Sequence, residues 1–159
     1  MTSRLEDLAA TRDIAQQLRK LEIYIRNETT IEPKLNHLVK MRASQINGCA
    51  HCLMLHAEEA LKDGEQVDRL SLLSAWQEAA DWFTPREQAA LVWTEALTNI
   101  SSTHVSDEMY ASVREQFSEK ELADLTLSII AINGWNRINV PFATPAHHFE
   151  VPVPEAVAS

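Results

Sequence analysis

The apolar residues near the start of the chain recur at helical spacing. Ile14, Leu18, Leu21 and Ile25 fall at positions i, i+4, i+7 and i+11, which predicts an amphipathic helix with a narrow apolar stripe. Such a stripe packs either on the chain's own core or on a neighbouring subunit. Alternating β-branched residues, which would indicate strands, are nearly absent, and the chain has only three glycines. The pattern therefore favours an all-α fold.

Start and stop signals divide the rest of the chain into further helices. Pro33 suits the first turn of a second helix, which Gln45–Gly48 would connect to a third. Gly64 is a natural stop for that third helix, which would run to about Lys62. Further apolar sets predict helices near 70–76, through 85–96 and from Ser106 onwards. We expect a single helical domain of about six to eight helices over residues 1–140.

Two capping boxes mark the starts of the later helices. Thr84 with Glu87 forms the first box, and Pro85 takes the first helical position between them. Ser118 with Glu121 forms the second and opens the most apolar segment of the chain, residues 122–135. A helix that is apolar on most sides is usually buried at the centre of a fold.

The last helix and the tail carry two further signals. Gly134 inside a helix costs about 1 kcal/mol relative to alanine, which a close approach by another helix would explain. Pro141 should end this helix. The tail 141–159 holds four of the six prolines and lacks periodicity. It is expected to form an extended or disordered arm.

Composition and charge narrow the class of protein. A chain of 159 residues with 45% hydrophobic residues can bury a substantial core. A net charge of −9 and a pI near 5.1 argue against nucleic acid as the main partner. No stretch resembles a signal peptide or a membrane span, so a cytoplasmic location is expected. In a reducing compartment, a lone C-x-x-C motif is more often catalytic or metal-binding than structural.

Both cysteines of the protein lie in one short motif. On a helix, Cys49, Cys52 and His56 at i, i+3 and i+7 share one face. Asn47 or Gly48 would supply the N-cap, which places both thiols in the first helical turn. Unpaired N–H groups there, and a nearby imidazolium, can lower a thiol pKa to roughly 3.5–7.5. The motif therefore suits a reactive thiol pair.

Several readings of this motif remain open from the residues alone. The first is a redox-active dithiol. A second is a zinc site through Cys49, Cys52 and His56 with a fourth ligand. A third is a pair of buried cysteines that act as small hydrophobic side chains. Leu53 stands where covalent haem attachment requires histidine, and the predicted absence of strands argues against a thioredoxin fold. The candidates for a fourth zinc ligand are scattered along the chain: His37, His104, His147 and His148.

The sequence around the motif resembles a known family. Residues 44–56, Ser-Gln-Ile-Asn-Gly-Cys-x-x-Cys-x-x-x-His, are similar to the core motif of the alkylhydroperoxidase D-like (AhpD-like) branch of the carboxymuconolactone decarboxylase family. The similarity continues through residues 75–76, 84–97 and Asn133-x-Trp-Asn-Arg137, and covers about residues 10–140. The resemblance implies an all-helical protein that assembles through its helices into trimers or hexamers.

The resemblance also implies a thiol-dependent peroxidase, an oxidoreductase with peroxide as acceptor. Cys52 would attack a hydroperoxide to give a sulfenic acid, and Cys49 would condense with it to give a disulfide. His56 would belong to the proton relay, and His51 matches a histidine of some relatives. An external dithiol would then reduce the disulfide. A lipoyl group on a carrier protein is the expected donor, and a peroxiredoxin is another possible partner. No tightly bound cofactor and no metal is expected.

One position departs from the family pattern. Relatives commonly carry a relay glutamate twelve residues before the first cysteine, where this chain has His37. Imidazole accepts a proton near neutral pH but supplies no permanent negative charge. Glu58 and Glu59 could substitute, although solvated surface positions are expected for both. The alternatives to a peroxidase are a decarboxylase-type lyase, whose members generally lack paired thiols, and a zinc-binding or scaffold oligomer without enzyme activity.

Overall fold

The computed structural model describes residues 3–5 and 11–147, which form eight α-helices and two short 3-10 turns and no β-strand. The α-helices are listed here in chain order with their bounds: α1 Arg12–Glu28, α2 Pro33–Asn47, α3 Ala50–Lys62, α4 Val67–Leu72, α5 Pro85–Thr98, α6 Ile100–Thr103, α7 Asp107–Arg114 and α8 Glu119–Asn139. The 3-10 turns are η2 (Leu73–Ala75) and η3 (Ala80–Trp82). The predicted all-α class is confirmed.

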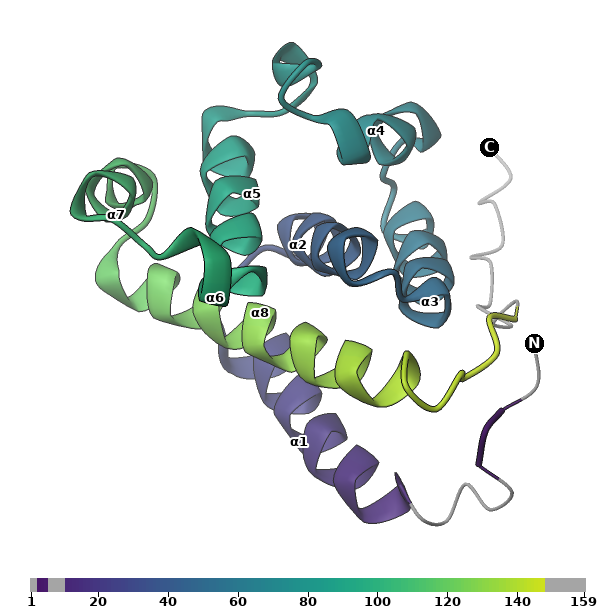
Figure 1. Ribbon diagram of the computed structural model, residues 1–159. Coiled ribbons are helices and arrows are strands. Elements are labelled where there is room, and N and C mark those ends of the chain that lie inside the picture. The colour runs from purple at the N-terminus through teal and green to yellow at the C-terminus, as the bar shows by residue number, and fades with distance from the viewer. Residues whose placement is uncertain (1–2, 6–10, 148–159) are drawn as a thin grey trace.

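Helices α2 and α8 form the centre of the bundle (Figure 1). Helix α2 packs against α3 on one side, α5 on the other, and α8, while α1 lies along α8. The main core joins α2, α5, α7 and α8 through side chains that include Val39, Trp93, Phe117 and Leu125. A separate apolar cluster of Ala43, Cys49, Cys52 and Ile132 packs against Trp135 where α2, α3 and α8 meet. The two cysteines therefore lie within the folded core.

The local start signals predicted from sequence are present. Both capping boxes are complete: the hydroxyl of each cap residue accepts the backbone N–H of the glutamate three residues later, and that glutamate accepts the N–H of the cap residue. Thr84 with Glu87 begins α5, and Ser118 with Glu121 begins α8. These starts depend on neighbouring residues alone, which explains why they can be read without knowing the fold.

Gly134 marks the closest approach of α1 to α8. A Cβ built on Gly134 would lie 3.3 Å from Cδ2 of Leu18, which is tighter than ordinary packing contacts of about 3.5–4.0 Å. The predicted reason for a glycine inside this apolar helix, close contact with another helix, is confirmed.

The segment after α8 folds back against the domain. The backbone N–H of Arg4 donates to the carbonyl of Phe142 at 3.0 Å, and Arg4 Nη1 donates to the carbonyl of Pro141 at 3.0 Å. Residues 141–147 of the predicted tail are therefore held by contacts, while 148–159 lie outside the described residues. None of the described helices combines the length and apolarity needed to cross a membrane.

Candidate active site

The junction of α2 and α3 places the two thiols. Gly48 has φ 66, a left-handed conformation that glycine adopts without strain, and it caps the C-terminus of α2. The prediction that Asn47 or Gly48 is the N-cap of the next helix is wrong, as is a connection starting at Gln45. Because Asn47 still belongs to α2, Cys49 itself is the N-cap of α3. Cys49 therefore sits just outside the helix and Cys52 inside its first turn.

Each sulfur accepts a hydrogen bond. The backbone N–H of Cys52 donates to Cys49 Sγ at 3.4 Å, and the side-chain amide of Asn139 donates to Cys52 Sγ at 3.3 Å. Both cysteines are free thiols with 2% of their surface exposed. Hydrogen bonds to sulfur favour the thiolate, whereas burial favours the neutral thiol.

The interaction between the two thiols shifts their pKa values in opposite directions. The hydrogen bond from the Cys52 thiol lowers the pKa of Cys49 to about 7, against the opposing effect of burial. The backbone N–H of Cys52 and the side chain of Asn136 lower it further. The pKa of Cys52 is raised, because its proton is held in the bond to Cys49 and because it is buried. Near neutral pH the pair thus retains one proton on Cys52 and places the negative charge on Cys49.

A network of amides locks α2 to α8 beside the thiols. Asn47 Nδ2 donates to Oδ1 of Asn133 at 3.0 Å and to Oδ1 of Asn136 at 2.8 Å. Asn136 in turn donates to the hydroxyl of Ser44 at 3.1 Å. Because these side chains come from both helices and bond one another, the end of α8 that bears Asn139 is fixed relative to the thiols.

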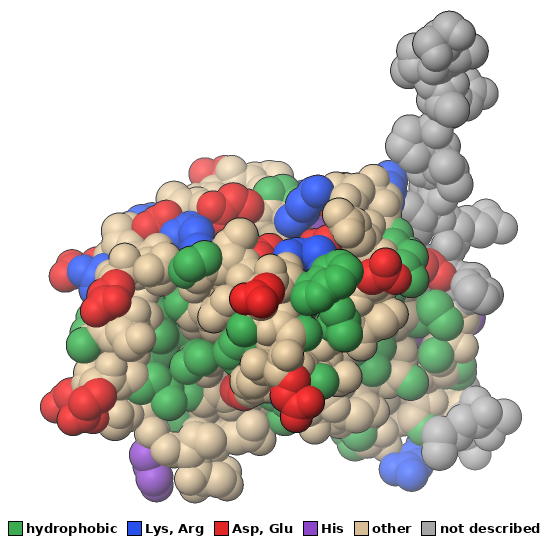
Figure 2. Space-filling view, turned by 90° about the horizontal axis from the view of Figure 1, so that it is seen from above, with side chains coloured by type: hydrophobic (Ala, Val, Ile, Leu, Met, Phe, Trp, Pro, Cys, Tyr) green, Lys and Arg blue, Asp and Glu red, His purple; other side chains and the backbone are tan. Residues whose placement is uncertain are grey.

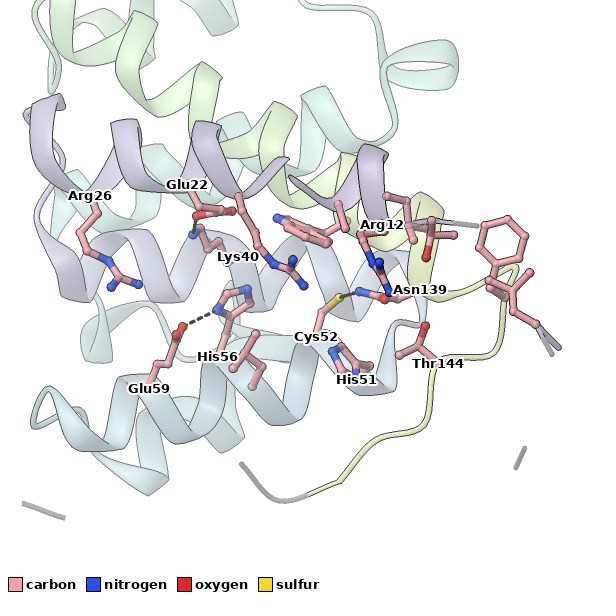
Figure 3. Close-up of a pocket in the computed structure, with 18 residues that line it drawn as sticks. Arg12, Glu22, Arg26, Lys40, His51, Cys52, His56, Glu59, Asn139 and Thr144 are labelled. Atoms are coloured by element: carbon pink, nitrogen blue, oxygen red, sulfur yellow. Dashed lines mark hydrogen bonds and ion pairs between the residues drawn. The ribbon is translucent and has the colours of Figure 1, made fainter. Parts of the chain in front are cut away.

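Cys52 faces a cavity of about 560 Å³ (Figure 3). Its wall includes Cys52, His56 and His51 from α3, Trp135 and Asn139 from α8, and side chains from α1. Cys49 is not among the lining residues and packs with Ala43 and Ile132 instead. The lowered pKa therefore favours Cys49 as the thiolate, whereas access from the cavity favours Cys52 as the sulfur that meets a substrate.

His56 is a buried base held by a carboxylate. Its Nδ1 lies 2.9 Å from Oε2 of Glu59, and the dashed line in Figure 3 marks this bond. Burial lowers the pKa of His56, although the Glu59 hydrogen bond opposes that effect. For Glu59, burial acts to raise the pKa, but the hydrogen bond and charge of His56 outweigh it and the pKa is lowered. The pair is accordingly a neutral imidazole beside an ionised carboxylate at neutral pH.

The expectation that Glu59 is a solvated surface charge is wrong. Its side chain is 30% exposed, and its carboxylate contacts His56 and lies 3.9 Å from Nδ1 of His37. His37 is bonded through Nε2 to Asp63 at 2.8 Å and lines a second cavity with Glu59 and Asp63, not the cavity that contains Cys52. The carboxylate missing at position 37 is thus present on α3.

His51 lies at the rim of the cavity. Its Nδ1 is 2.8 Å from the carbonyl of Pro145, and its ring contacts that of His147. His51 is therefore held against the segment that follows α8, apart from the His56 cluster. His148, one of the scattered zinc candidates, lies outside the described residues.

Three arginines line the same cavity from α1. Arg12, Arg19 and Arg26 are spaced seven residues apart, all reach the cavity wall, and none makes an ion pair within the described part of the chain. Lys40 adds a fourth cation, although it pairs with Glu22. A cavity in a protein of net charge −9 thus carries an excess of positive groups on one side.

Sequence reasoning did not identify Asn139 or Asn136 as neighbours of the thiols. Asn139 is 87 positions from Cys52, and asparagine in a helix carries no signal of its own beyond low helix propensity. The predicted set is partly brought together: Cys49 with Cys52, and His56 with His37. His51 lines the same cavity but lies at its rim, apart from the His56 cluster.

The fold and the site define a small helical protein with a buried thiol pair at the wall of a cavity. The chain belongs to the carboxymuconolactone decarboxylase family, whose sequence profile matches residues 10–96. It is 42% identical over 119 residues to the uncharacterized protein YdfG of Bacillus subtilis strain 168, which covers 75% of this chain and 80% of that protein.

Solved structures place the chain within one branch of this family. A protein from Agrobacterium tumefaciens, ATU0492, described as of unknown function and as a proposed antioxidant defence protein AhpD, shares 34% identity with a TM-score of 0.87. The match covers 93% of this chain and all of that one. The debrominase Bmp8, in complex with 2,3,4-tribromopyrrole, is 19% identical with a TM-score of 0.76, over 88% of this chain and 74% of that one. The fold is therefore AhpD-like, as the sequence motif predicted.

Proposed function

We propose that the protein is a thiol-dependent peroxidase that cycles between the Cys49–Cys52 dithiol and a disulfide. The observation that carries the proposal is the placement of the two thiols: Cys52 lines the cavity, and Cys49, which accepts the backbone N–H of Cys52 at 3.4 Å, has a pKa lowered to about 7. With the two thiols so close, one can accept the proton of the other to leave a thiolate, and can later attack the sulfenic acid to form the disulfide.

In the proposed cycle, Cys52 reacts with the peroxide and Cys49 then forms the disulfide. The shared proton passes from Cys52 to Cys49, so that the cavity-lining sulfur becomes the thiolate. Cys52 then attacks the peroxide, forming an S–O bond as the O–O bond breaks, and the released alkoxide takes the Cys49 proton to give an alcohol. The Cys49 thiolate attacks the sulfenic sulfur of Cys52, the S–S bond forms, and the departing hydroxide is protonated to water.

His56 is proposed to relay that last proton: it takes up a proton from water in the cavity and passes it to the departing hydroxide. It lines the cavity one helical turn beyond Cys52, and its lowered pKa keeps it neutral until a proton arrives. Glu59 fixes the ring through Nδ1 and stabilises the imidazolium when it forms. The Glu59 carboxylate thereby replaces the charge that His37 lacks.

The reductant is proposed to be an external dithiol of the lipoyl type, carried by a protein, with a peroxiredoxin as an alternative partner. Neither is bound tightly in this proposal, because the dithiol needs to enter only after the disulfide has formed. The peroxide is proposed to carry an anionic group, since Arg12, Arg19 and Arg26 line the cavity and form no ion pair with any described residue.

Assembly into a trimer or hexamer stays a prediction. Large apolar side chains are exposed on two adjoining helices, and a second copy could cover them: Ile14, Ile23 and Tyr24 on α1, and Ile130 on α8. Hydrophobic side chains interrupt a surface of mixed charge on the face shown in Figure 2. Burial of such groups on association would be favourable by about 25 cal/mol per Å².

Peroxide consumption with dihydrolipoamide as donor tests the proposal. Cys52→Ser should abolish turnover, and Cys49→Ser should react once and then accumulate sulfenic or sulfinic acid on Cys52. In the wild type, mild peroxide treatment should remove two hydrogens by intact mass, because a disulfide forms. Unchanged turnover in Cys52→Ser would overturn the proposal. Activity on a lactone acid that persists without either thiol would favour the decarboxylase-type alternative.

A further inference from the structure

A second cluster of ligand-type atoms lies behind the thiol cavity. His37 from α2, with His56 and Glu59 from α3, brings two imidazole nitrogens and a carboxylate oxygen within 4.8 Å of one another. Within the described residues, this is the one group of three or more His, Cys, Asp or Glu side chains that is so arranged, and neither thiol belongs to it. The predicted alternative of a zinc site through both cysteines therefore lacks the required convergence there.

The contact with Asp63 selects which ring nitrogen of His37 carries a hydrogen. A carboxylate only accepts hydrogen bonds, so the 2.8 Å contact between Nε2 of His37 and Oδ2 of Asp63 puts the hydrogen on Nε2. In the neutral ring the lone pair is then on Nδ1. This atom is buried and makes no hydrogen bond, and it faces Oε2 of Glu59 across 3.9 Å. Two acceptor atoms placed in this way can both bind one cation.

Carboxylate support of this kind is typical of metal-binding histidines. In most such sites the ring nitrogen that does not bind metal donates to a carboxylate, a carbonyl or water, which fixes the tautomer and raises the basicity of the ligand. Asp63 holds His37 in this way and leaves the opposite nitrogen aimed into the cluster. His56 is buried, and its Nδ1 already lies beside the same Glu59 oxygen.

The distances bracket those of a bound ion. Ligand atoms about 2.1 Å from a tetrahedral metal lie roughly 3.4 Å apart. The two contacts of Glu59 Oε2, 2.9 Å to His56 and 3.9 Å to His37, fall on either side of that value. The two imidazole nitrogens likewise lie within 4.8 Å of each other.

The surrounding charges also permit a dication. Glu59 and Asp63 are acidic, and the charge of the nearest cation, Lys40, is offset by its ion pair with Glu22. The cluster borders a second cavity of about 470 Å³ through His37, Glu59 and Asp63, which gives an ion and its remaining water ligands a path to the site.

We propose that His37 Nδ1, His56 Nδ1 and Glu59 Oε2 form a site for a divalent transition metal of the Zn²⁺ type, with Asp63 orienting His37. Two imidazoles and one carboxylate suit Zn²⁺ and its neighbours better than Ca²⁺ or Mg²⁺. Binding at Nδ1 requires the ring proton of neutral His56 to move to Nε2, which frees the Nδ1 lone pair for the metal. The site shares His56 with the proposed proton relay, but its existence does not depend on peroxidase activity.

The test uses a Cys49→Ser/Cys52→Ser variant, so that thiols cannot bind the metal. The full-length chain is stripped with a chelator and titrated with Co²⁺, whose visible absorption reports its ligands, and then with Zn²⁺ against a chromogenic chelator. One equivalent of Co²⁺ should bind, and Zn²⁺ should displace it. Adding His37→Gln should remove this binding, and adding Asp63→Asn should weaken it by about 10–100-fold. Glu58→Gln, one residue from Glu59, should leave it unchanged.

Thermal unfolding with and without Zn²⁺ is the second measurement. The melting temperature of the thiol-free variant should rise with Zn²⁺, and this rise should vanish with His37→Gln. If His37→Gln fails to fold, the exposed Asp63→Asn change carries the comparison. Equal Co²⁺ affinity with and without His37 would overturn the proposal, as would binding by the wild type that is lost when the thiols are replaced. The peroxidase assay is independent, since every variant here lacks the thiols.

Discussion

Asn139 donates its side-chain amide to the sulfur of Cys52 at 3.3 Å, from a position 87 residues further along the chain. The amide acts on the cavity-lining sulfur, whose pKa burial and the bond to Cys49 both raise. Of the contacts at Cys52, the hydrogen bond from Asn139 is the largest that favours the thiolate. It therefore opposes, in part, the two effects that keep Cys52 protonated.

Asn139→Ala should slow the oxidation of Cys52 by peroxide. Loss of a hydrogen bond to a charged group costs about 1.5–3 kcal/mol, so the single-turnover rate should fall roughly tenfold or more. Stopped-flow fluorescence of the tryptophans, or quenched-flow mass analysis, would measure this rate. Asn36→Ala, on α2 and away from the thiol cavity, is the matched control. Equal rates in the two variants would show that the amide has no part in the reaction.

The thiol pair should ionise near neutral pH. Because the pKa of Cys49 is lowered to about 7, thiolate absorbance at 240 nm should rise with pH through a midpoint there, and the charge should be lost on acidification. Cys52→Ala removes the largest cause of the shift. Its midpoint should move upward, toward the ordinary thiol value of 9.0. A midpoint that stays near 7 in that variant would mean that Cys52 does not stabilise the Cys49 thiolate.

Stability should fall on mild acidification because of His56. Burial lowers the pKa of His56 in the folded state below the ordinary value of 6.5. As the pH falls below 6.5, the unfolded chain therefore binds a proton at His56 more readily than the folded chain does. The free energy of unfolding should therefore decrease as pH drops below 6.5, by up to about 1.4 kcal/mol per pH unit for this group.

Urea unfolding between pH 5 and 7.5 measures the effect of His56. His56→Gln should flatten this dependence, whereas His104→Gln, at an exposed position between α6 and α7, should leave it unchanged. Parallel profiles for the wild type and His56→Gln would contradict the assignment.

The KM for anionic peroxides should depend on the arginines of α1. Arg19→Gln should raise KM for a carboxylate-bearing hydroperoxide about 5–10-fold, the effect of one partly solvated charge contact, and leave KM for tert-butyl hydroperoxide unchanged. Lys20→Gln removes the same charge from the neighbouring residue, which does not line the cavity. Equal changes for both substrates would show that Arg19 acts on structure and not on substrate charge.

Signals made by neighbouring residues could be read from the sequence. The boxes of Thr84 with Glu87 and Ser118 with Glu121 are confirmed because each is complete within four residues. The role of Asn47-Gly48 was harder to predict, since the same pair can end one helix or begin another. The left-handed Gly48 shows that it ends α2, so that Cys49 takes the cap of α3. The motif was found correctly, although its place relative to the helix was not.

Contacts between distant elements could not be read in this way. The i, i+3 spacing places His56 and Glu59 on one face of α3, but the burial of that face depends on how α3 packs in the bundle, which no local pattern records. The same holds for Asn139, whose partner lies on another helix. The helical period orders residues around one helix, but only packing decides which side is covered.

In the proposed cycle, the burial of both sulfurs restricts which kind of reductant can reach them. Only 2% of each cysteine is exposed. A cysteine on the surface of a folded redox protein could therefore contact either sulfur only if the helical bundle opened. A slender reductant on a flexible tether can pass along the cavity instead. The rate of regeneration would then follow tether length and local concentration, not the fit of two protein surfaces.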